Sequence, residues 1–322
     1  MKKIQLDSKK AEFLTRRHPW VFSGAIKSKT SHIEDGEIVQ LTDHEDNVKA
    51  VGFFQPGSIA VRVLSFENVE INQSFWNQRI QEAIDLRNEM GLLTEDNEIC
   101  RLVFGEGDNL PGLIVDYYNG VAVIQAHAVG MHLNKEAICE ALKVALDKDL
   151  KAVYYKSKNT LPERVESEDG YLFGEALVPH IAKENGIKFS INWVDGQKTG
   201  FFIDQRENRK RLAEFCKGKT VLNTFCYSGG FSLYALKAGA KHVDSLDSSE
   251  KAIALVEENL KINDSDIYQT EGKHNSIVAD AVKYVHQLET EYDIIVLDPP
   301  AFAKHKNKRH QAIKAYKLKP PE

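Results

Sequence analysis

The sequence lacks three features that would narrow its class at once: a long apolar run, clustered cysteines and an excess of basic residues. No apolar run approaches the roughly 18 residues that span a bilayer, so we expect neither a membrane span nor a secretory leader. The cysteines at 100, 139, 216 and 226 show no CxxC spacing, which favours reduced thiols over disulfides or a zinc site. We therefore expect a cytoplasmic protein without a bound metal.

The charge balance argues against a protein that coats nucleic acid non-specifically, because the 42 basic residues are outnumbered by 47 acidic ones and the formal net charge is -5. Local basic faces remain compatible with this balance. The stretches 206–211 and 304–319 could each contact phosphates, or each could be a solvated helix face. The length of 322 residues predicts two or three domains.

The first half of the chain predicts two small domains. Strands over 37–41, 50–54 and 59–64 are separated by turn residues, which indicates an all-β module over 1–70. A helix over 73–90 follows, and then strands that include a hairpin turn at Asn119-Gly120. These elements predict a central α+β domain over 71–185.

The remainder, 186–322, alternates helices with apolar strands, which is typical of a parallel α/β sheet. The strands are expected over 220–225, 242–247, 275–280 and 292–298, after a hairpin turn at Asn185-Gly186. Asp204 and Glu207 have the spacing of a capping box for the helix before the first strand. This last domain is expected to be Rossmann-like.

Polar residues and glycines gather where these strands end, which is where parallel sheets bind ligands. Gly229 and Gly230 follow the first strand, Asp247 the second, Asp280 the third and Asp298-Pro299-Pro300 the fourth. The spacing from Gly229 to Asp247 suits a carboxylate that accepts hydrogen bonds from ribose hydroxyls. The glycine loop does not have the GxGxxG pattern that holds a pyrophosphate, so S-adenosylmethionine is favoured over a dinucleotide.

The segment Asp298–Phe302 is the most specific motif. Two consecutive prolines fix the backbone and present the carbonyls and Asp298 rigidly toward the pocket. Phe302 could stack on a flipped base, as enzymes that modify bases require. The alternative is a strand stop followed by a core phenylalanine.

These motifs resemble the class I methyltransferases of the 23S ribosomal RNA large subunit methyltransferase I type. The resemblance rests on 200–209, 225–232, Asp247, Asp280 and 298–302, while 18–26 resembles the N-terminal PUA domain of that family, a small β-barrel that binds RNA. It implies formation of 5-methylcytosine in 23S rRNA from S-adenosylmethionine. It also implies an α/β protein with a PUA-like barrel, a central α+β domain and a class I methyltransferase domain.

The resemblance further implies a role for each site residue. Those expected to bind the cofactor are Lys198, Phe202, Asp204, Arg206, Phe225, Tyr227, Ser228, Gly229, Asp247 and Asp280. Asp247 is expected to hold the ribose and Asp280 the adenine amino group. Asp298, Pro299 and Phe302 are expected to position the target base. For Asp204 and Glu207, helix capping alone is the alternative.

The resemblance implies a cysteine nucleophile on a segment that follows the DPPxF motif, so we expect the nucleophile beyond residue 322 and an incomplete sheet in this chain. Cys226 is the only cysteine near the expected pocket, but it lies in the cofactor loop. We therefore name no catalytic cysteine, and the activity of this chain stays open.

Three alternatives remain. A related family that methylates guanine N7 shares the loop and DPPxF and needs no cysteine. A chain without its last strands could bind RNA without catalysis, since an incomplete sheet would bind the cofactor poorly and its exposed edge favours aggregation. A dehydrogenase fits less well because GxGxxG is absent. A homodimer stays open as the assembly.

Overall fold

The computed structural model describes residues 1–7, 14, 16–263 and 273–300. Phe302 and the basic stretch 304–319 lie outside the described residues. The chain divides into two compact units, which we call the N-terminal unit (Met1–His180 with Asn192–Gly200) and the C-terminal unit (Ile181–Ile191 with Phe201–Glu322). Within the part of the chain that is described, no helix has both the length and the apolar character needed to cross a membrane.

The N-terminal unit begins with the predicted all-β module. Its five-stranded sheet has the order β1-β3-β4-β5-β2, with β1 (Lys2–Gln5), β2 (Trp20–Phe22), β3 (Ile38–Thr42), β4 (Val48–Phe54) and β5 (Ile59–Ser65). β4 and β5 approach closely at Gly52, where a Cβ would lie 2.2 Å from the carbonyl oxygen of Arg62. A short 3-10 helix, η2 (Ser23–Ala25), follows β2. The prediction of a small β module is confirmed.

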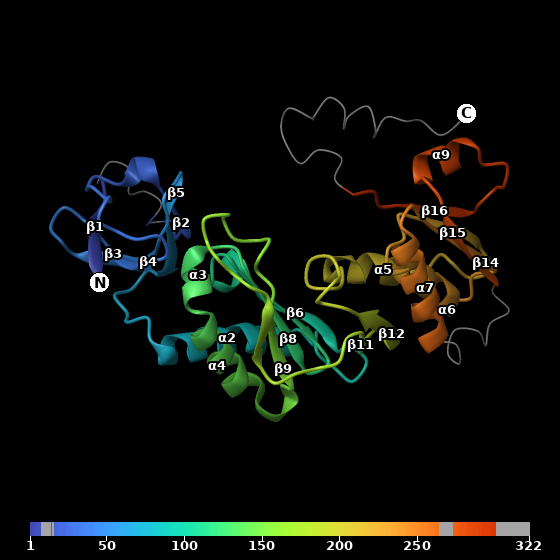
Figure 1. Ribbon diagram of the computed structural model, residues 1–322, viewed down its shortest axis with the longest axis horizontal. Coiled ribbons are helices and arrows are strands. Elements are labelled where there is room, and N and C mark those ends of the chain that lie inside the picture. The colour runs from blue at the N-terminus through green and yellow to red at the C-terminus, as the bar shows by residue number, and fades with distance from the viewer. Residues whose placement is uncertain (8–13, 15, 264–272, 301–322) are drawn as a thin grey trace. The chain divides into compact units, whose positions relative to one another are not determined.

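The second sheet of this unit has the order β10-β9-β8-β7-β6, with β6 (Ile99–Phe104), β7 (Leu113–Tyr118), β8 (Val121–Ala126), β9 (Ala152–Tyr155) and β10 (Gly170–Phe173). Helices α2 (Gln73–Glu89), α3 (Val129–Leu133) and α4 (Lys135–Leu146) accompany it, with the 3-10 helices η3 (Gly105–Asp108) and η4 (Asp147–Asp149) (Figure 1). The turn at Asn119-Gly120 joins β7 to β8 with φ of 43° and 95°, which confirms the predicted hairpin.

The C-terminal unit contains the β11–β12 hairpin (His180–Glu184, Ile187–Ile191) and a four-stranded parallel sheet of order β15-β14-β13-β16. The strands are β13 (Thr220–Thr224), β14 (His242–Asp247), β15 (Lys273–Val278) and β16 (Ile294–Leu297); the helices are η5 (Ile203–Gln205), α5 (Arg206–Ala213), α6 (Gly230–Lys237), α7 (Glu250–Ile262) and α9 (Ala281–His286) (Figure 1). The four predicted parallel strands are confirmed. The strand order reverses between β13 and β16, which makes this the topological switch point.

Two buried asparagines attach the hairpin to α7: Asn259 within the helix and Asn263, its C-cap residue. Asn263 accepts from the backbone amide of Lys188 at 2.9 Å and donates to its carbonyl at 2.7 Å. Asn259 accepts from the amide of Ser190 at 2.7 Å and donates to the carbonyl of Ser228 at 2.8 Å. One side chain thus connects the hairpin to the loop after β13.

The predicted capping box is wrong. The helix begins at Arg206, its N-cap residue is Gln205, and no side-chain cap hydrogen bond is present. The physical reason is the 3-10 turn at 203–205, in which the amide of Arg206 already donates to the carbonyl of Ile203. The division at 70 and 185 stays a prediction; position 185 lies in the turn of the β11–β12 hairpin.

Candidate active site

The loop after β13 has an unusual backbone. Phe225, Tyr227 and Gly229 have φ of 53°, 46° and 72°, and two of these are bulky residues that seldom adopt a positive φ. The amide of Cys226 donates to the carbonyl of Leu246 at 3.1 Å, and the amide of Gly229 donates to the carbonyl of Cys226 at 2.8 Å. Strain of this kind persists where the surroundings impose it, and it concentrates at ligand sites.

Asp247 stands at the end of the neighbouring strand β14 and helps to hold this loop. Its Oδ2 accepts from the amide of Tyr227 at 3.1 Å, and its Oδ1 accepts from the amide of Ser249 at 3.0 Å. A carboxylate offers about four lone-pair positions, so roughly two remain for further donors. The side chain is therefore fixed at the switch point and still able to accept hydrogen bonds.

Gly229 and Gly230 allow close packing of helices, in addition to the positive φ that Gly229 adopts in the loop. A Cβ on Gly229 would lie 3.0 Å from Cγ1 of Val256 on α7, and a Cβ on Gly230 would lie 2.9 Å from Cδ of Arg209 on α5. A larger residue would push α6 away from both helices. The loop and the helix that follows it are thus positioned together.

Beneath the loop lies a buried ionic cluster that the sequence did not reveal. Glu184 is fully buried and accepts from Nε and Nη2 of Arg209, each at 2.8 Å. The hydroxyl of Tyr234 also donates to Glu184, at 3.0 Å, and Nε of Arg206 lies 3.5 Å from its carboxylate. The cluster joins the hairpin to α5 and α6.

The cluster changes the interpretation of the basic stretch 206–211. Arg206 and Arg209 are buried and face Glu184, whereas Lys210 and Arg211 are exposed. Neither alternative for this stretch, phosphate contact or a solvated face, fits the two buried arginines. Their spacing of three positions on one helix face was the signal that could have indicated a buried partner.

Arg209 extends the cluster to the segment that precedes α5. Its Nη2 donates to the carbonyl of Phe202 at 3.0 Å, and its guanidinium lies over the ring of Phe201 at 4.9 Å. The Phe202 ring meets Tyr227 edge to face, with 5.1 Å between ring centroids. Phe202 therefore lies beside the positive-φ loop, and its cofactor role stays a prediction.

Asp298 lies against the segment around Asp204. Its Oδ2 accepts from Nε2 of Gln205 at 3.1 Å, and Gln205 in turn accepts from Asn208 at 2.7 Å. Burial, followed by the negative charge of Asp204, raises the pKa of Asp298. Two motifs far apart in the sequence thus meet at the end of β16. The hydrogen bond from Gln205 to Asp298 was not predicted from the sequence.

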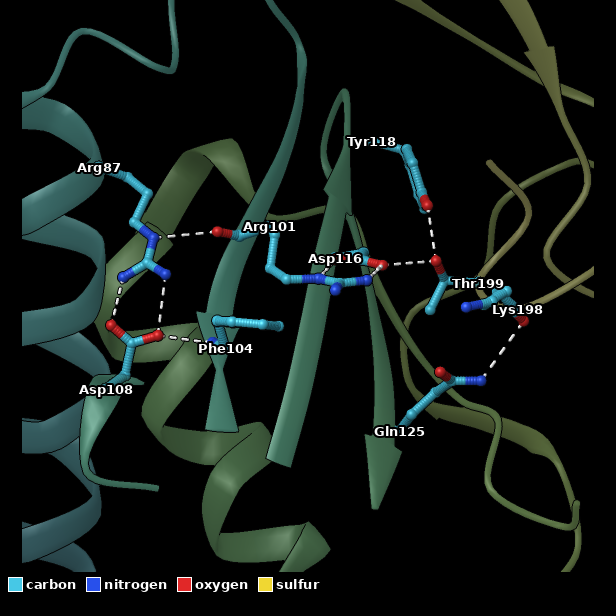
Figure 2. Close-up of polar contacts among 9 residues, drawn as sticks. All are labelled: Arg87, Arg101, Phe104, Asp108, Asp116, Tyr118, Gln125, Lys198 and Thr199. Atoms are coloured by element: carbon cyan, nitrogen blue, oxygen red, sulfur yellow. Dashed lines mark hydrogen bonds and ion pairs between the residues drawn. The ribbon is translucent and has the colours of Figure 1, made fainter. Parts of the chain in front are cut away.

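The other predicted residues occupy different positions. Asp280 follows β15 and caps α9 by accepting from the amide of Lys283 at 2.9 Å. Ser228 is buried in the loop, and Pro299 follows Asp298. Lys198 belongs to the N-terminal unit, where its carbonyl accepts from Gln125 at 3.4 Å (Figure 2).

The cysteines are all buried. Burial, followed by the charge of Asp247, strongly raises the pKa of Cys226, and burial raises the pKa of Cys216 to about 11. Burial likewise raises the pKa of Cys139 to about 11. A thiol with a pKa this high is protonated at neutral pH, which disfavours it as a nucleophile.

Comparison with known proteins gives two family matches. Residues 4–66 match the PUA-like domain family, and residues 100–319 match the S-adenosylmethionine-dependent methyltransferase family. A protein of Aliivibrio fischeri named ribosomal RNA large subunit methyltransferase I is 36% identical over 98% of this chain and 80% of its own length. A protein of the same name from Shewanella denitrificans is 38% identical over the same shares.

Two solved structures show the same fold. SMU.776, described as a methyltransferase and complexed with SAH, has a TM-score of 0.79 and 24% identity, covering 95% of this chain and 78% of its own. A structure from Streptococcus mutans, described as an S-adenosylmethionine-dependent methyltransferase, has a TM-score of 0.78 and 24% identity, covering 98% of this chain and 82% of its own.

Proposed function

The chain belongs to the S-adenosylmethionine-dependent methyltransferase family, and on that premise we propose that it methylates large-subunit ribosomal RNA, forming 5-methylcytosine in 23S rRNA. The substrate is assigned on one observation: the chain is 36% identical, over 98% of its length, to a protein named for that RNA. The PUA-like match over 4–66 supports an RNA substrate independently of the methyltransferase domain. The methyl donor of the family is S-adenosylmethionine.

The strand-end residues fit this cofactor. Asp247 retains lone pairs after binding two backbone amides, so we assign it to the ribose hydroxyls. The positive-φ loop, with Phe225, Tyr227, Ser228 and Gly229, would surround the methionine portion, and Phe202 would close over it. Asp280 would accept from the adenine amino group beyond its bond to the amide of Lys283. When bound, the cofactor supplies an electrophilic methyl group.

The target base is assigned to the end of β16. Asp298 can accept from the exocyclic amino group of cytosine, which is the usual partner of a carboxylate in base recognition. Gln205 orients Asp298, and Asp204 acts through it by raising the pKa of its carboxyl group. Pro299 holds the backbone rigid beside it. Arg206, next to Glu184, and Lys198, in the other unit, keep their cofactor roles as proposals without a supporting contact.

The cytosine reaction needs a thiolate that adds to C6, so that C5 can take the methyl group before a base removes the C5 proton. Burial strongly raises the pKa of Cys226, the cysteine in the loop after β13, and so disfavours it as this thiolate. A second candidate is methylation of guanine N7, in which the ring nitrogen attacks the methyl group directly and no covalent enzyme intermediate forms.

Nucleoside analysis tests both candidates. The chain is incubated with unmodified 23S rRNA and S-adenosylmethionine carrying an isotope-labelled methyl group, and the RNA is digested for mass spectrometry. We expect labelled 5-methylcytidine. Labelled 7-methylguanosine would overturn the cytosine product, and absence of any labelled nucleoside from a chain that binds S-adenosylmethionine in calorimetry would overturn both.

Two further assignments belong to this proposal. We place the protein in the cytoplasm, because its substrate is assembled there, and we keep a homodimer as the alternative to a monomer. Sedimentation velocity distinguishes the two assemblies, and microscopy of a fluorescent fusion checks the location.

A further inference from the structure

Ser228 lies between two residues of the positive-φ loop, Tyr227 with φ of 46° and Gly229 with φ of 72°. The peptide plane that joins Ser228 to Gly229 determines the φ of Gly229, so a rotation of this plane would move Gly229 out of the left-handed region. The carbonyl group of Ser228 belongs to that plane. A partner that binds this carbonyl therefore fixes the conformation of the loop.

Helix α7 supplies this partner. Nδ2 of Asn259 donates to the carbonyl of Ser228 at 2.8 Å. One turn earlier on the helix, Val256 packs so closely against Gly229 that a Cβ on the glycine would lie 3.0 Å from its Cγ1. The amide of Tyr227 donates to Asp247 of β14 at 3.1 Å. Three consecutive loop residues thus have three different contacts, two of them with α7.

The partners of Asn259 determine how its side-chain amide is oriented. The side chain is fully buried, and its Oδ1 accepts from the backbone amide of Ser190 at 2.7 Å. A backbone amide can only donate and a carbonyl can only accept, so the oxygen must face Ser190 and the nitrogen must face Ser228. The hydroxyl of Ser190 also donates to Glu258 at 2.6 Å, which attaches Ser190 to α7 a second time. The Asn259 side chain is therefore held in one orientation.

Asn263 makes the same kind of bonds without reaching the loop. It is buried as well, and it accepts from the amide of Lys188 at 2.9 Å and donates to the carbonyl of Lys188 at 2.7 Å. Its nitrogen also donates to the backbone carbonyl of Asn259 at 2.7 Å. Asn263 thus bonds the hairpin and α7, whereas Asn259 bonds the hairpin and the positive-φ loop.

We propose that Asn259 is a positioning residue for S-adenosylmethionine, an inference that rests on the proposed assignment of the positive-φ loop to the methionine portion of the cofactor. It acts through Ser228, whose peptide plane it holds in the orientation that the loop requires. A ligand site binds tightly when its residues are held in place before the ligand arrives. Removal of the bond to Ser228 is therefore expected to weaken cofactor binding, although Asn259 itself touches no cofactor atom.

The test compares Asn259→Asp with Asn263→Asp in the full chain. Aspartate keeps the size of asparagine and replaces the donating group by an acceptor, so the first variant leaves the Ser228 carbonyl without its donor and the second does the same to Lys188. We expect S-adenosylmethionine affinity in calorimetry to fall roughly 5- to 30-fold for Asn259→Asp. The affinity of Asn263→Asp is expected to stay unchanged, while urea denaturation shows a similar loss of stability in both variants.

A second measurement reports on the loop directly. The ¹H–¹⁵N resonance of Gly229, whose nitrogen shares the peptide plane of the Ser228 carbonyl, is expected to shift in Asn259→Asp and to stay in place in Asn263→Asp. Equal cofactor affinities of the two variants would overturn the inference, as would a Gly229 resonance that Asn259→Asp leaves in place. Asn259→Ala and Asn263→Ala repeat the comparison without a new charge if an aspartate variant fails to fold.

The proposed function fails in a different way. A chain that binds S-adenosylmethionine but methylates no RNA would overturn the proposed substrate and leave the inference standing, because calorimetry measures cofactor binding alone. Failure of the unsubstituted chain to bind S-adenosylmethionine would overturn both.

Discussion

Each unit contains a fully buried carboxylate bound by an arginine in the two-pronged geometry, and the two arginines differ in exposure. Asp116 accepts from Nε and Nη2 of Arg101 at 2.8 and 2.9 Å, and Glu184 accepts from the same atoms of Arg209 at 2.8 Å each. The Arg101 side chain is 31% exposed, whereas that of Arg209 is 4% exposed. Water can therefore replace the first arginine more readily than the second.

The two carboxylates also hold different segments. Asp116 accepts from the hydroxyl of Thr199, which bonds in turn to Tyr118, and so attaches 192–200 to the central sheet (Figure 2). Glu184 holds Arg209 and Tyr234, and Arg209 contacts Phe202 beside the cofactor loop. A buried carboxylate–arginine pair thus holds a connecting segment in one unit and supports the proposed catalytic site in the other.

The largest effect is expected from Arg209→Ala, which leaves Glu184 buried with an uncompensated charge. The free energy of unfolding should fall by about 3–5 kcal/mol in urea denaturation followed by circular dichroism. Arg209→Lys is the control that keeps the charge without the paired geometry, and it should lose less. A fall below about 1 kcal/mol for the alanine variant would mean that water reaches Glu184.

Asp247→Ala tests the site that the Glu184 cluster supports. It removes the acceptor assigned to the ribose hydroxyls, and hydrogen bonds to a charged group imply an affinity for S-adenosylmethionine lowered roughly 10- to 100-fold in calorimetry. Glu250→Ala, which removes an exposed carboxylate in the first turn of α7 directly after β14, is the matched control and should leave affinity unchanged. Equal affinities of the Asp247 variant and the unsubstituted chain would refute the ribose assignment.

Arg101→Ala is the counterpart of Arg209→Ala in the other unit, and it compares the stability lost from a partly exposed pair with that lost from a buried pair. Because Arg101 is partly exposed, water can enter beside Asp116, and we expect a loss of about 1–2 kcal/mol in the same urea experiment. A loss as large as that of the Arg209 variant would show that the difference in exposure is without energetic consequence.

The smallest effect concerns the pH response of Asp298. Burial and then the charge of Asp204 raise its pKa, so folding favours its protonated form. The stability that this group contributes is present below its unfolded pKa and is lost as the pH rises through the folded pKa. Asp204→Asn should lower the pKa of Asp298 in a ¹³C NMR titration. An unchanged titration would mean that the two carboxylates do not interact.

The sequence allowed the local features to be predicted. The four parallel strands, the Asn-Gly hairpin turns and the loop around Gly229 each depend on residues that are close along the chain. The Glu184–Arg209 pair could not be predicted, because it joins a hairpin to a helix and its residue types are those of an ordinary surface. The same holds for Asn259, whose two partners come from a strand and from a distant loop.

The family resemblance predicted that residues from separate motifs lie close together, and the structure shows such contacts for some of them. Phe202 and Tyr227 meet, and Asp298 meets the segment around Asp204. The role of Asp204 as a helix cap failed because a 3-10 turn precedes the helix, a feature that no residue preference signals.

The division into units has a practical consequence for anyone who wishes to study either part alone. The chain passes from one unit to the other after His180, after Ile191 and again after Gly200. No single cut in the gene therefore yields both units intact. A fragment that starts at Phe201 would lose the hairpin, and with it Glu184 and the strand that Asn259 binds. Subcloning the catalytic part would require starting near Ile181 and replacing 192–200 by a short artificial connector.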